Sequence, residues 1–309
     1  MLVTGIGGFV GPWLTRALRD GGHEVHGLVR PGDASPAGAR LHSGDVTDGP
    51  GLERVLAAVQ PDAIVHLAAI SSVAEAEADV DATYRVNLGG TIALLAAMRA
   101  AVPRARLLHV GSSDAYGAVR RDELPVGEDV PFRPVSVYGA SKAAADVAAG
   151  QWARAYDLDV VRVRPFNHTG PGQSPVFVCA ALARQLARIE RGVQEPVLRC
   201  GNADPVRDFS DVRDIVAGYV ALLERGVAGE AYNLCAGEGV SIAEVIALLR
   251  AHATVPVRVK SEPGLRRGID VERIVGSHAL ATRATGWRPR IPLADTLRDV
   301  LDDWRARRD

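Results

Sequence analysis

Short apolar runs alternate with longer amphipathic stretches along the first half of the 309-residue chain. The runs typical of buried strands are 2–4, 24–29, 63–67, 105–110 and 159–163. The stretches whose apolar residues recur at helical spacing are 9–18, 83–101 and 137–156. Alternating strands and helices are typical of a mostly parallel sheet with helices on both faces. We therefore predict an α/β fold built on a Rossmann-type, doubly wound parallel sheet.

The alternation becomes irregular beyond about residue 166. Helical spacing recurs at 177–191, 212–225, 242–253 and 292–305, and strand-like runs recur at 197–200, 231–234 and 255–259. These elements predict a smaller C-terminal α/β lobe joined to the sheet. The predicted first domain is 1–166, and the lobe is mainly 167–309, with some of its segments returning to the sheet.

Charge and composition restrict the partners and the environment. Lysine and arginine total 36 against 37 aspartate and glutamate residues, so no global field favours nucleic acid or an anionic membrane. No apolar stretch approaches the roughly 20 residues of a membrane span, and the first residues do not resemble a secretion signal. We expect a cytoplasmic protein without nucleic-acid or membrane partners.

Cysteine and histidine form no metal-binding or disulfide pattern in the sequence. Cys179, Cys200 and Cys235 are odd in number and show no CxxC spacing. The eight histidines are scattered without ligand spacing. We expect buried thiols and no metal site.

A glycine-rich segment lies between the first predicted strand and the first predicted helix. Glycine at 5, 8 and 11 would allow a tight turn, close approach to a pyrophosphate and close helix packing. Such a pattern alone is weak evidence because turns are rich in glycine, but here the strand and helix that the motif requires flank it. The predicted dinucleotide-binding residues are Gly5, Gly7, Gly8, Phe9, Val10 and Gly11.

The ends of the next strands indicate which dinucleotide binds. The second strand ends near Arg30, whose guanidinium suits the 2′-phosphate of NADP, whereas an acid there would bind the ribose of NAD. We expect NADP(H) to be preferred and NAD(H) to be possible, although exposed arginines at strand ends are also common. Further cofactor contacts are predicted at Asp45, Val46, Leu67, Ala68 and Ala69.

Tyr138 and Lys142 are four residues apart on a predicted helix, which places both on one face. A phenol with a pKa near 10 is a poor acid–base catalyst at neutral pH, and an adjacent ammonium is expected to lower that pKa. Ser112, at the end of the preceding strand, is expected to hold a carbonyl oxygen. The alternative is an ordinary helix start with a packed tyrosine, which the upstream glycine loop disfavours. Tyr138 and Lys142 are also expected to contact the cofactor.

Six motifs occur in the order characteristic of the extended short-chain dehydrogenase/reductases that act on nucleotide sugars. They are the glycine loop, GDV at 44–46, HLAA at 66–69, GSS at 111–113, YGASK at 138–142 and RPFN at 164–167. The segments RPFNHTGPGQSP at 164–175 and GNADPVRDFSDVRDI at 201–215 resemble most the branch of GDP-mannose 4,6-dehydratases and GDP-6-deoxymannose reductases. Within it the chain is most similar to the reductases, and the resemblance covers essentially the whole chain.

The resemblance implies a nucleotide-sugar site in the lobe, with Arg207 on the diphosphate. The alternative is that Arg207 pairs with Asp208 or Asp211 and only steadies its loop. Where the family has Arg-Pro-x-Glu, this chain has RRGID at 266–270, which puts the role of the acid in doubt. The expected substrate contacts are Ser113, Asn167, Arg207 and Arg266. The branch also implies a homodimer formed through helices 83–101 and 137–156.

The activity implied by the resemblance is NAD(P)H-dependent reduction of the 4-keto group of an NDP-4-keto-6-deoxyhexose. The first expectation is GDP-4-keto-6-deoxy-D-mannose, which would give GDP-6-deoxy-D-mannose. The alternatives are a GDP-mannose 4,6-dehydratase, a dTDP-4-keto-6-deoxyhexose reductase and an NDP-sugar epimerase of the same family.

A reductase and a dehydratase differ in how many acid–base groups they need. A dehydratase needs a second acid–base group, which is glutamate in dehydratases that resemble this chain and is Asp114 here, so Asp114 favours a reductase only modestly. A non-catalytic cofactor sensor on the same fold would not need Ser112, Tyr138 and Lys142 together, and this sequence has all three.

Overall fold

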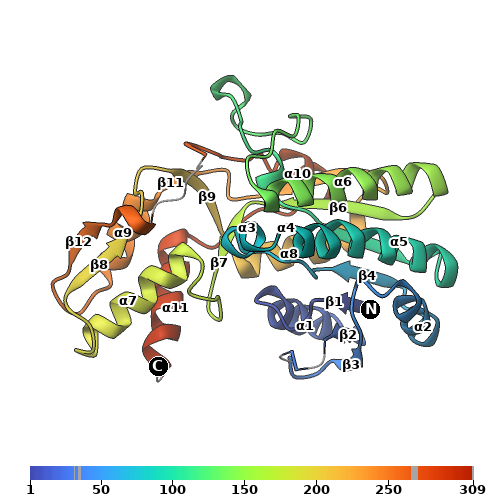
Figure 1. The fold of residues 1–309 in the computed structure, drawn as a ribbon, viewed down its shortest axis with the longest axis horizontal. Helices are drawn as coiled ribbons and strands as arrows, with labels where there is room; N and C mark the ends of the chain where they lie inside the picture. Colours follow the sequence, from blue (N-terminus) through green and yellow to red (C-terminus); the bar gives the residue numbers. More distant parts are fainter. Residues whose placement is uncertain (31, 34–35, 266–270, 308–309) are drawn as a thin grey trace.

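The computed structural model describes residues 1–30, 32–33, 36–265 and 271–307, and its centre is a seven-stranded sheet (Figure 1). All its neighbouring strands are parallel, in the order β10-β6-β5-β4-β1-β2-β3. These strands are β1 (Leu2–Thr4), β2 (His26–Val29), β3 (Arg40–Ser43), β4 (Ala63–His66), β5 (Arg106–Val110), β6 (Val160–Pro165) and β10 (Ala231–Leu234). The predicted doubly wound α/β fold is confirmed.

Helices cover both faces of this sheet, whose inner strands are apolar on both sides. One face is covered by α1 (Val10–Asp20) and α8 (Val212–Arg225), which share an apolar core with β1, β5 and β6. The opposite face is covered by α2 (Gly49–Val59), α5 (Gly90–Ala101) and α6 (Val137–Tyr156). The short helices α3 (Val73–Ala78) and α4 (Val80–Tyr84) follow β4.

A second apolar core lies in the C-terminal half, at the left of Figure 1. It is enclosed by α7 (Val178–Glu190), α9 (Ile242–Ala251), α11 (Leu293–Ala306) and the parallel pair β8 (Val197–Cys200) and β12 (Arg258–Ser261). A three-stranded sheet of β11 (Gly239–Ser241), β9 (Val206–Asp211) and β7 (Asn167–Thr169) lies between this core and the central sheet. Helix α10 (Ala279–Thr285) contacts α8. The three cysteines are buried and unpaired, as predicted.

The structure differs from the sequence-based prediction mainly at short elements. The sequence did not predict β3, α2, α3, β7, β9, β11 and α10. The strand predicted at 159–163 extends to Pro165 as β6, and the next residues, Asn167–Thr169, form β7 because they pair with β9. The helix predicted at 83–101 is α4 and α5 joined by a π-helical turn at Arg85–Gly89. The last predicted strand, 255–259, begins only at Arg258.

Candidate active site

A cavity of about 1540 Å³ opens at the carboxyl edge of the central sheet and extends into the lobe. Its walls come from the loops after β1, β2, β4, β5 and β6 and from lobe residues such as Phe177 and Arg207. Ligands of open α/β sheets bind at this edge. Because single small-molecule pockets have volumes of roughly 300–1,000 Å³, this cavity has room for a dinucleotide and a second ligand.

The glycine loop lies tightly against the first turn of α1. Gly5 has a φ of +67°, and a Cβ there would lie 2.6 Å from the amide nitrogen of Ala68. A Cβ on Gly11 would lie 1.8 Å from the carbonyl oxygen of Ile6, so Gly11 allows the helix to meet the loop. No side chain caps the N-terminus of α1, and its first turn holds no acid, which leaves the positive helix end available for an anion. The loop therefore fits a dinucleotide diphosphate.

The predicted cofactor residues lie along one side of the cavity, with one exception. Gly11 is buried beneath the loop and does not line the cavity. The lining residues among the predicted set are Gly5, Gly7, Gly8, Phe9, Val10, Arg30, Asp45, Val46, Leu67, Ala68, Ala69, Tyr138 and Lys142. The structure therefore brings the separate sequence motifs to one wall.

Arg30 lies at the exposed rim of the cavity beside an acid. Its Nε and Nη2 donate to the two carboxylate oxygens of Asp33, at 3.2 and 3.3 Å. The hydrogen bond from Arg30 lowers the pKa of Asp33. Arg30 is thus accessible to a ribose phosphate, with a carboxylate as its present partner.

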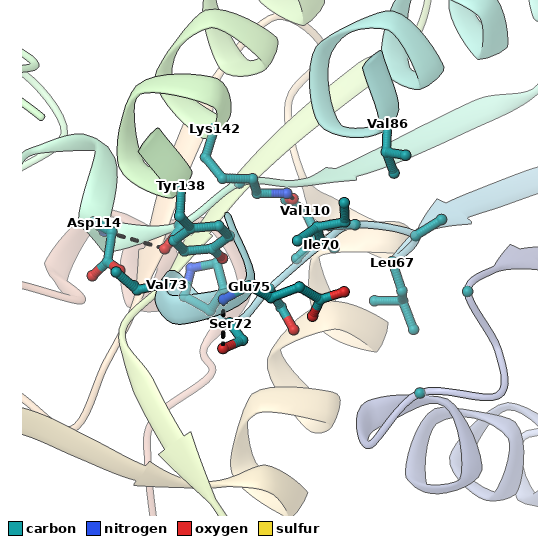
Figure 2. Close-up of a pocket in the computed structure, with 18 of the residues that line it drawn as sticks. Leu67, Ile70, Ser72, Val73, Glu75, Val86, Val110, Asp114, Tyr138 and Lys142 are labelled. Carbon is teal, nitrogen blue, oxygen red and sulfur yellow. Dashed lines mark hydrogen bonds between the residues drawn. The ribbon is translucent and has the colours of Figure 1, made fainter. Parts of the chain in front are cut away.

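Tyr138 and Lys142 lie side by side in the cavity (Figure 2), and Ser112 lines the same cavity. Ser136 caps α6 by accepting a hydrogen bond from the amide of Gly139 at 3.0 Å, so the helix begins just before Tyr138. Tyr138 and Lys142 extend from the same face of this helix. Ser112 follows β5, and its hydroxyl accepts a hydrogen bond from the amide of Asp114 at 3.1 Å.

The electrostatics of this cluster differ from the sequence-based expectation. Loss of solvent raises the pKa of Tyr138, and the nearby Asp114 carboxylate raises it further, while a hydrogen bond with Ser112 acts in the opposite direction. The Lys142 ammonium donates to the carbonyl oxygen of Val110, and burial lowers the pKa of Lys142 to about 8. The expectation that Lys142 lowers the pKa of Tyr138 is therefore wrong. Tyr138 is a protonated phenol at neutral pH and can donate a proton.

A buried ion cluster fixes α6 against the sheet. Asp146, one turn beyond Lys142, is 1% exposed and accepts hydrogen bonds from Arg162 at 2.7 Å and from both Nε and Nη2 of Arg164 at 2.9 Å. Arg164 also donates to the hydroxyl of Tyr116 at 2.9 Å. The cluster thereby joins α6, β6 and the segment after β5, which together carry Ser112, Tyr138 and Lys142.

The predicted substrate residues lie on the lobe side of the cavity or close to Ser112. Arg207 donates to the carbonyl oxygens of Val206 and Val271, at 2.9 and 2.7 Å. Asp208 accepts hydrogen bonds from backbone amides, and Asp211 binds Arg213. The lining residues among the predicted set are Ser113, Asp114, Asn167 and Arg207. Arg266 and Asp270 lie outside the described residues.

Several residues that the sequence analysis did not single out also line the cavity. His168 stacks on Phe9 of the glycine loop, with ring centroids 6.2 Å apart, and joins β7 to the cofactor side. In the sequence, only the position of His168 next to Asn167 indicated that it could lie near the site. Asp33, Glu75 and Tyr219 line the cavity as well, and no motif marked them.

The described part of the chain has neither a cluster of metal-ligating side chains nor a helix that could span a membrane. Within it, no group of three or more histidine, cysteine, aspartate or glutamate side chains could hold a metal ion. Across the same residues, no helix has the length and apolar character needed to cross a membrane.

Comparisons with known proteins agree with this arrangement. The family model described as GDP-mannose 4,6 dehydratase matches residues 2–300. GDP-6-deoxy-D-mannose reductase of Pseudomonas aeruginosa is 40% identical over 80% of this chain and 81% of its own length. UDP-glucose 4-epimerase of Streptomyces lividans is 32% identical over 93% and 91%. The solved structure of RMD from Pseudomonas aeruginosa complexed with NADPH superposes with a TM-score of 0.87 and 37% identity, covering 99% of this chain and 98% of that one.

Proposed function

Because the chain belongs to the GDP-mannose 4,6-dehydratase-like group of extended short-chain dehydrogenase/reductases and is therefore an oxidoreductase, we propose that it is a nucleotide-sugar 4-ketoreductase. The proposed reaction is the NADPH-dependent reduction of GDP-4-keto-6-deoxy-D-mannose to GDP-6-deoxy-D-mannose. The 40% identity to a GDP-6-deoxy-D-mannose reductase supports this substrate. The uncapped helix end beside the glycine loop and the accessible Arg30 fit NADPH, and the neighbouring Asp33 leaves NADH possible.

The proposed mechanism needs one proton donor. The bound cofactor supplies hydride to the carbonyl carbon. Tyr138 donates its phenolic proton to the carbonyl oxygen, and the Ser112 hydroxyl donates a hydrogen bond that orients this oxygen. Lys142, one turn beyond Tyr138 on α6, lines the cavity and would hold the nicotinamide ribose of the bound cofactor. Solvent then returns the proton to Tyr138.

The observation that carries the assignment to reduction is the 40% identity to a GDP-6-deoxy-D-mannose reductase over 80% of this chain. Tyr138 is a phenol that lines the cavity and can donate the one proton that ketone reduction requires. A dehydratase needs a further acid–base group, for which this chain has Asp114.

The test is a comparison of two substrates. The purified protein should consume NADPH stoichiometrically with GDP-4-keto-6-deoxy-D-mannose, and it should leave GDP-mannose unchanged without added NADPH. Formation of a 4-keto-6-deoxy product from GDP-mannose alone would instead favour the dehydratase, with Asp114 as its additional acid–base group.

A panel of nucleoside diphosphates tests which nucleotide base the site binds. A ligand at 100 times its Kd adds about 2.7 kcal/mol of stability, which a thermal-shift measurement detects. Stabilisation by dTDP and not by GDP would overturn the choice of GDP.

We expect Arg207→Ala to raise the KM for the keto sugar about 10- to 100-fold, because a charge-assisted hydrogen bond to a diphosphate is worth about 1.5–3 kcal/mol. Steady-state kinetics at saturating NADPH measure the effect, and kcat should change less than KM. Arg258→Ala, at an exposed position on β12, is the control and should leave KM unchanged. If Arg207→Ala lowers only the melting temperature, Arg207 acts by holding the Val206 and Val271 carbonyls.

We also propose that the protein forms a homodimer through α5 and α6. Three apolar side chains on these two helices support the proposal, because Ile92, Val147 and Tyr156 leave 39%, 58% and 40% of their surfaces exposed and could be covered by a partner. Val147→Glu should produce a monomer at micromolar concentration, measured by light scattering after size exclusion. Val193→Glu, at an equally exposed lobe position (57%), should leave the dimer intact. A wild-type monomer would refute the proposed interface.

A further inference from the structure

A second tyrosine reaches the inner end of the cavity from the face of the sheet opposite Tyr138. Tyr219 lies on α8, whereas Tyr138 lies on α6, and both side chains line the cavity. Tyr219 packs among residues of the core that includes Val110 and Val163, at the carboxyl ends of β5 and β6. Burial raises the pKa of Tyr219, and the proximity of the Tyr138 hydroxyl raises it further.

The direction of α8 explains how Tyr219 reaches this position. The first turn of α8 lies near the carboxyl edge of the sheet, where a Cβ on Gly170 would come within 2.5 Å of Val212. The last turn lies near the amino edge, where Arg106 at the start of β5 donates to the Leu223 carbonyl at 3.0 Å. Side chains on a helix point back toward its N-terminus. The Tyr219 hydroxyl is therefore directed up toward the carboxyl edge and into the cavity.

The hydroxyl of Tyr219 lacks a protein partner in the described part of the chain. Only 1% of Tyr219 is exposed, and its oxygen is not among the fully enclosed atoms without a hydrogen bond, so it retains access to the cavity. The other large buried tyrosines differ: the Tyr116 hydroxyl bonds Asn233 at 2.8 Å, and the Tyr232 hydroxyl accepts the Val227 amide at 3.0 Å. Buried tyrosine hydroxyls usually have a partner. Among the described residues, the Tyr219 hydroxyl therefore has a free donor that a group bound in the cavity can use.

The reaction itself restricts which ligand group lies there. Hydride and proton must reach the same carbonyl group, so the nicotinamide ring has to bind beside Tyr138. The polar substituent of that ring is a carboxamide, whose oxygen accepts hydrogen bonds. We infer that Tyr219 is a positioning residue that donates a hydrogen bond to the nicotinamide carboxamide of the bound cofactor and so fixes the orientation of the ring. This inference rests on the cofactor of the proposed function and does not depend on which sugar is reduced.

The test compares whole cofactor with a cofactor fragment. Dissociation constants are measured calorimetrically for NADPH and for 2′-phospho-ADP-ribose, which lacks the nicotinamide ring. Tyr219→Phe should weaken NADPH binding roughly two- to tenfold, the effect of one lost neutral hydrogen bond, and should leave fragment binding unchanged. Equal weakening of both ligands, or no weakening of either, would overturn the inference. A rise only in the KM for the sugar would assign the hydroxyl to the substrate and would also overturn it.

Tyr232→Phe is the matched control, because Tyr232 is equally buried and its hydroxyl has a backbone partner. It should lower the melting temperature by about 2–4 °C and leave both dissociation constants unchanged. Tyr219→Phe should show the opposite pattern, with an unchanged melting temperature and weaker NADPH binding. If the wild-type protein binds no NADPH, the proposed function fails; if it binds NADPH and Tyr219→Phe binds it equally well, only the role of Tyr219 fails.

Discussion

Tyr138→Phe lowers kcat for keto-sugar reduction by about 10²–10⁴-fold, the usual contribution of a positioned general acid. The change removes the phenolic proton and leaves the ring that lines the cavity. Because the hydroxyl transfers its proton only during the reaction, the Kd for NADPH should stay within about twofold. Stopped-flow measurement of NADPH oxidation in a single turnover gives the chemical step directly.

The same Tyr232→Phe control separates loss of the proton donor from a general effect of removing a buried hydroxyl. That variant should retain full kcat, since Tyr232 does not line the cavity. A Tyr138→Phe enzyme with undiminished kcat would show that another group supplies the proton, and Asp114 would then be the first to substitute.

Asp146→Ala lowers the free energy of unfolding by about 3–5 kcal/mol, because it leaves the buried Arg164 and the partly buried Arg162 without their carboxylate. Arg164 is 5% exposed and donates hydrogen bonds from both Nε and Nη2 to Asp146, so water cannot replace the lost partner easily. For a chain of this size we expect the melting temperature to fall by roughly 6–20 °C. Differential scanning calorimetry measures the change.

An exposed ion pair supplies the comparison for Asp146. Asp122 pairs with Arg120 at 3.5 Å, and the two side chains are 77% and 67% exposed. Asp122→Ala should change the free energy of unfolding by less than about 1 kcal/mol. If the two variants lose similar stability, the buried cluster around Asp146 does not hold α6 in the way described above.

The parts of the site that could be predicted from the sequence are those whose geometry is local. The glycine loop joins a strand directly to a helix, and Tyr138 and Lys142 are one helical turn apart, so the chain itself fixes their relation. The fold class could also be predicted, because the alternation of strands and helices is written directly in the order of apolar and amphipathic segments along the chain. Short elements such as β7 were missed because their partner, β9, is remote in sequence.

The pKa of Tyr138 and the position of Tyr219 depend on three-dimensional surroundings. Spacing placed Lys142 next to Tyr138, but the Val110 carbonyl that accepts the hydrogen bond of the lysine ammonium belongs to β5, which is remote in sequence. Burial, which decides the direction of the Tyr138 shift, depends on the elements that surround Tyr138 in the fold. Tyr219 lies in an apolar helical pattern typical of core packing, so only its missing partner distinguishes it.

The last strand of the central sheet affects the order in which the protein can fold during synthesis. β10 pairs with β6, although residues 166–230, which include α7 and α8, separate the two strands in the chain. Asn233 of β10 also binds the Tyr116 hydroxyl at 2.8 Å. A nascent chain that ends before residue 231 therefore has an unpaired β6 edge, and such edges recruit foreign strands. The ribosome has to deliver much of the second half before the first half is protected, so a fragment ending at residue 166 is expected to aggregate.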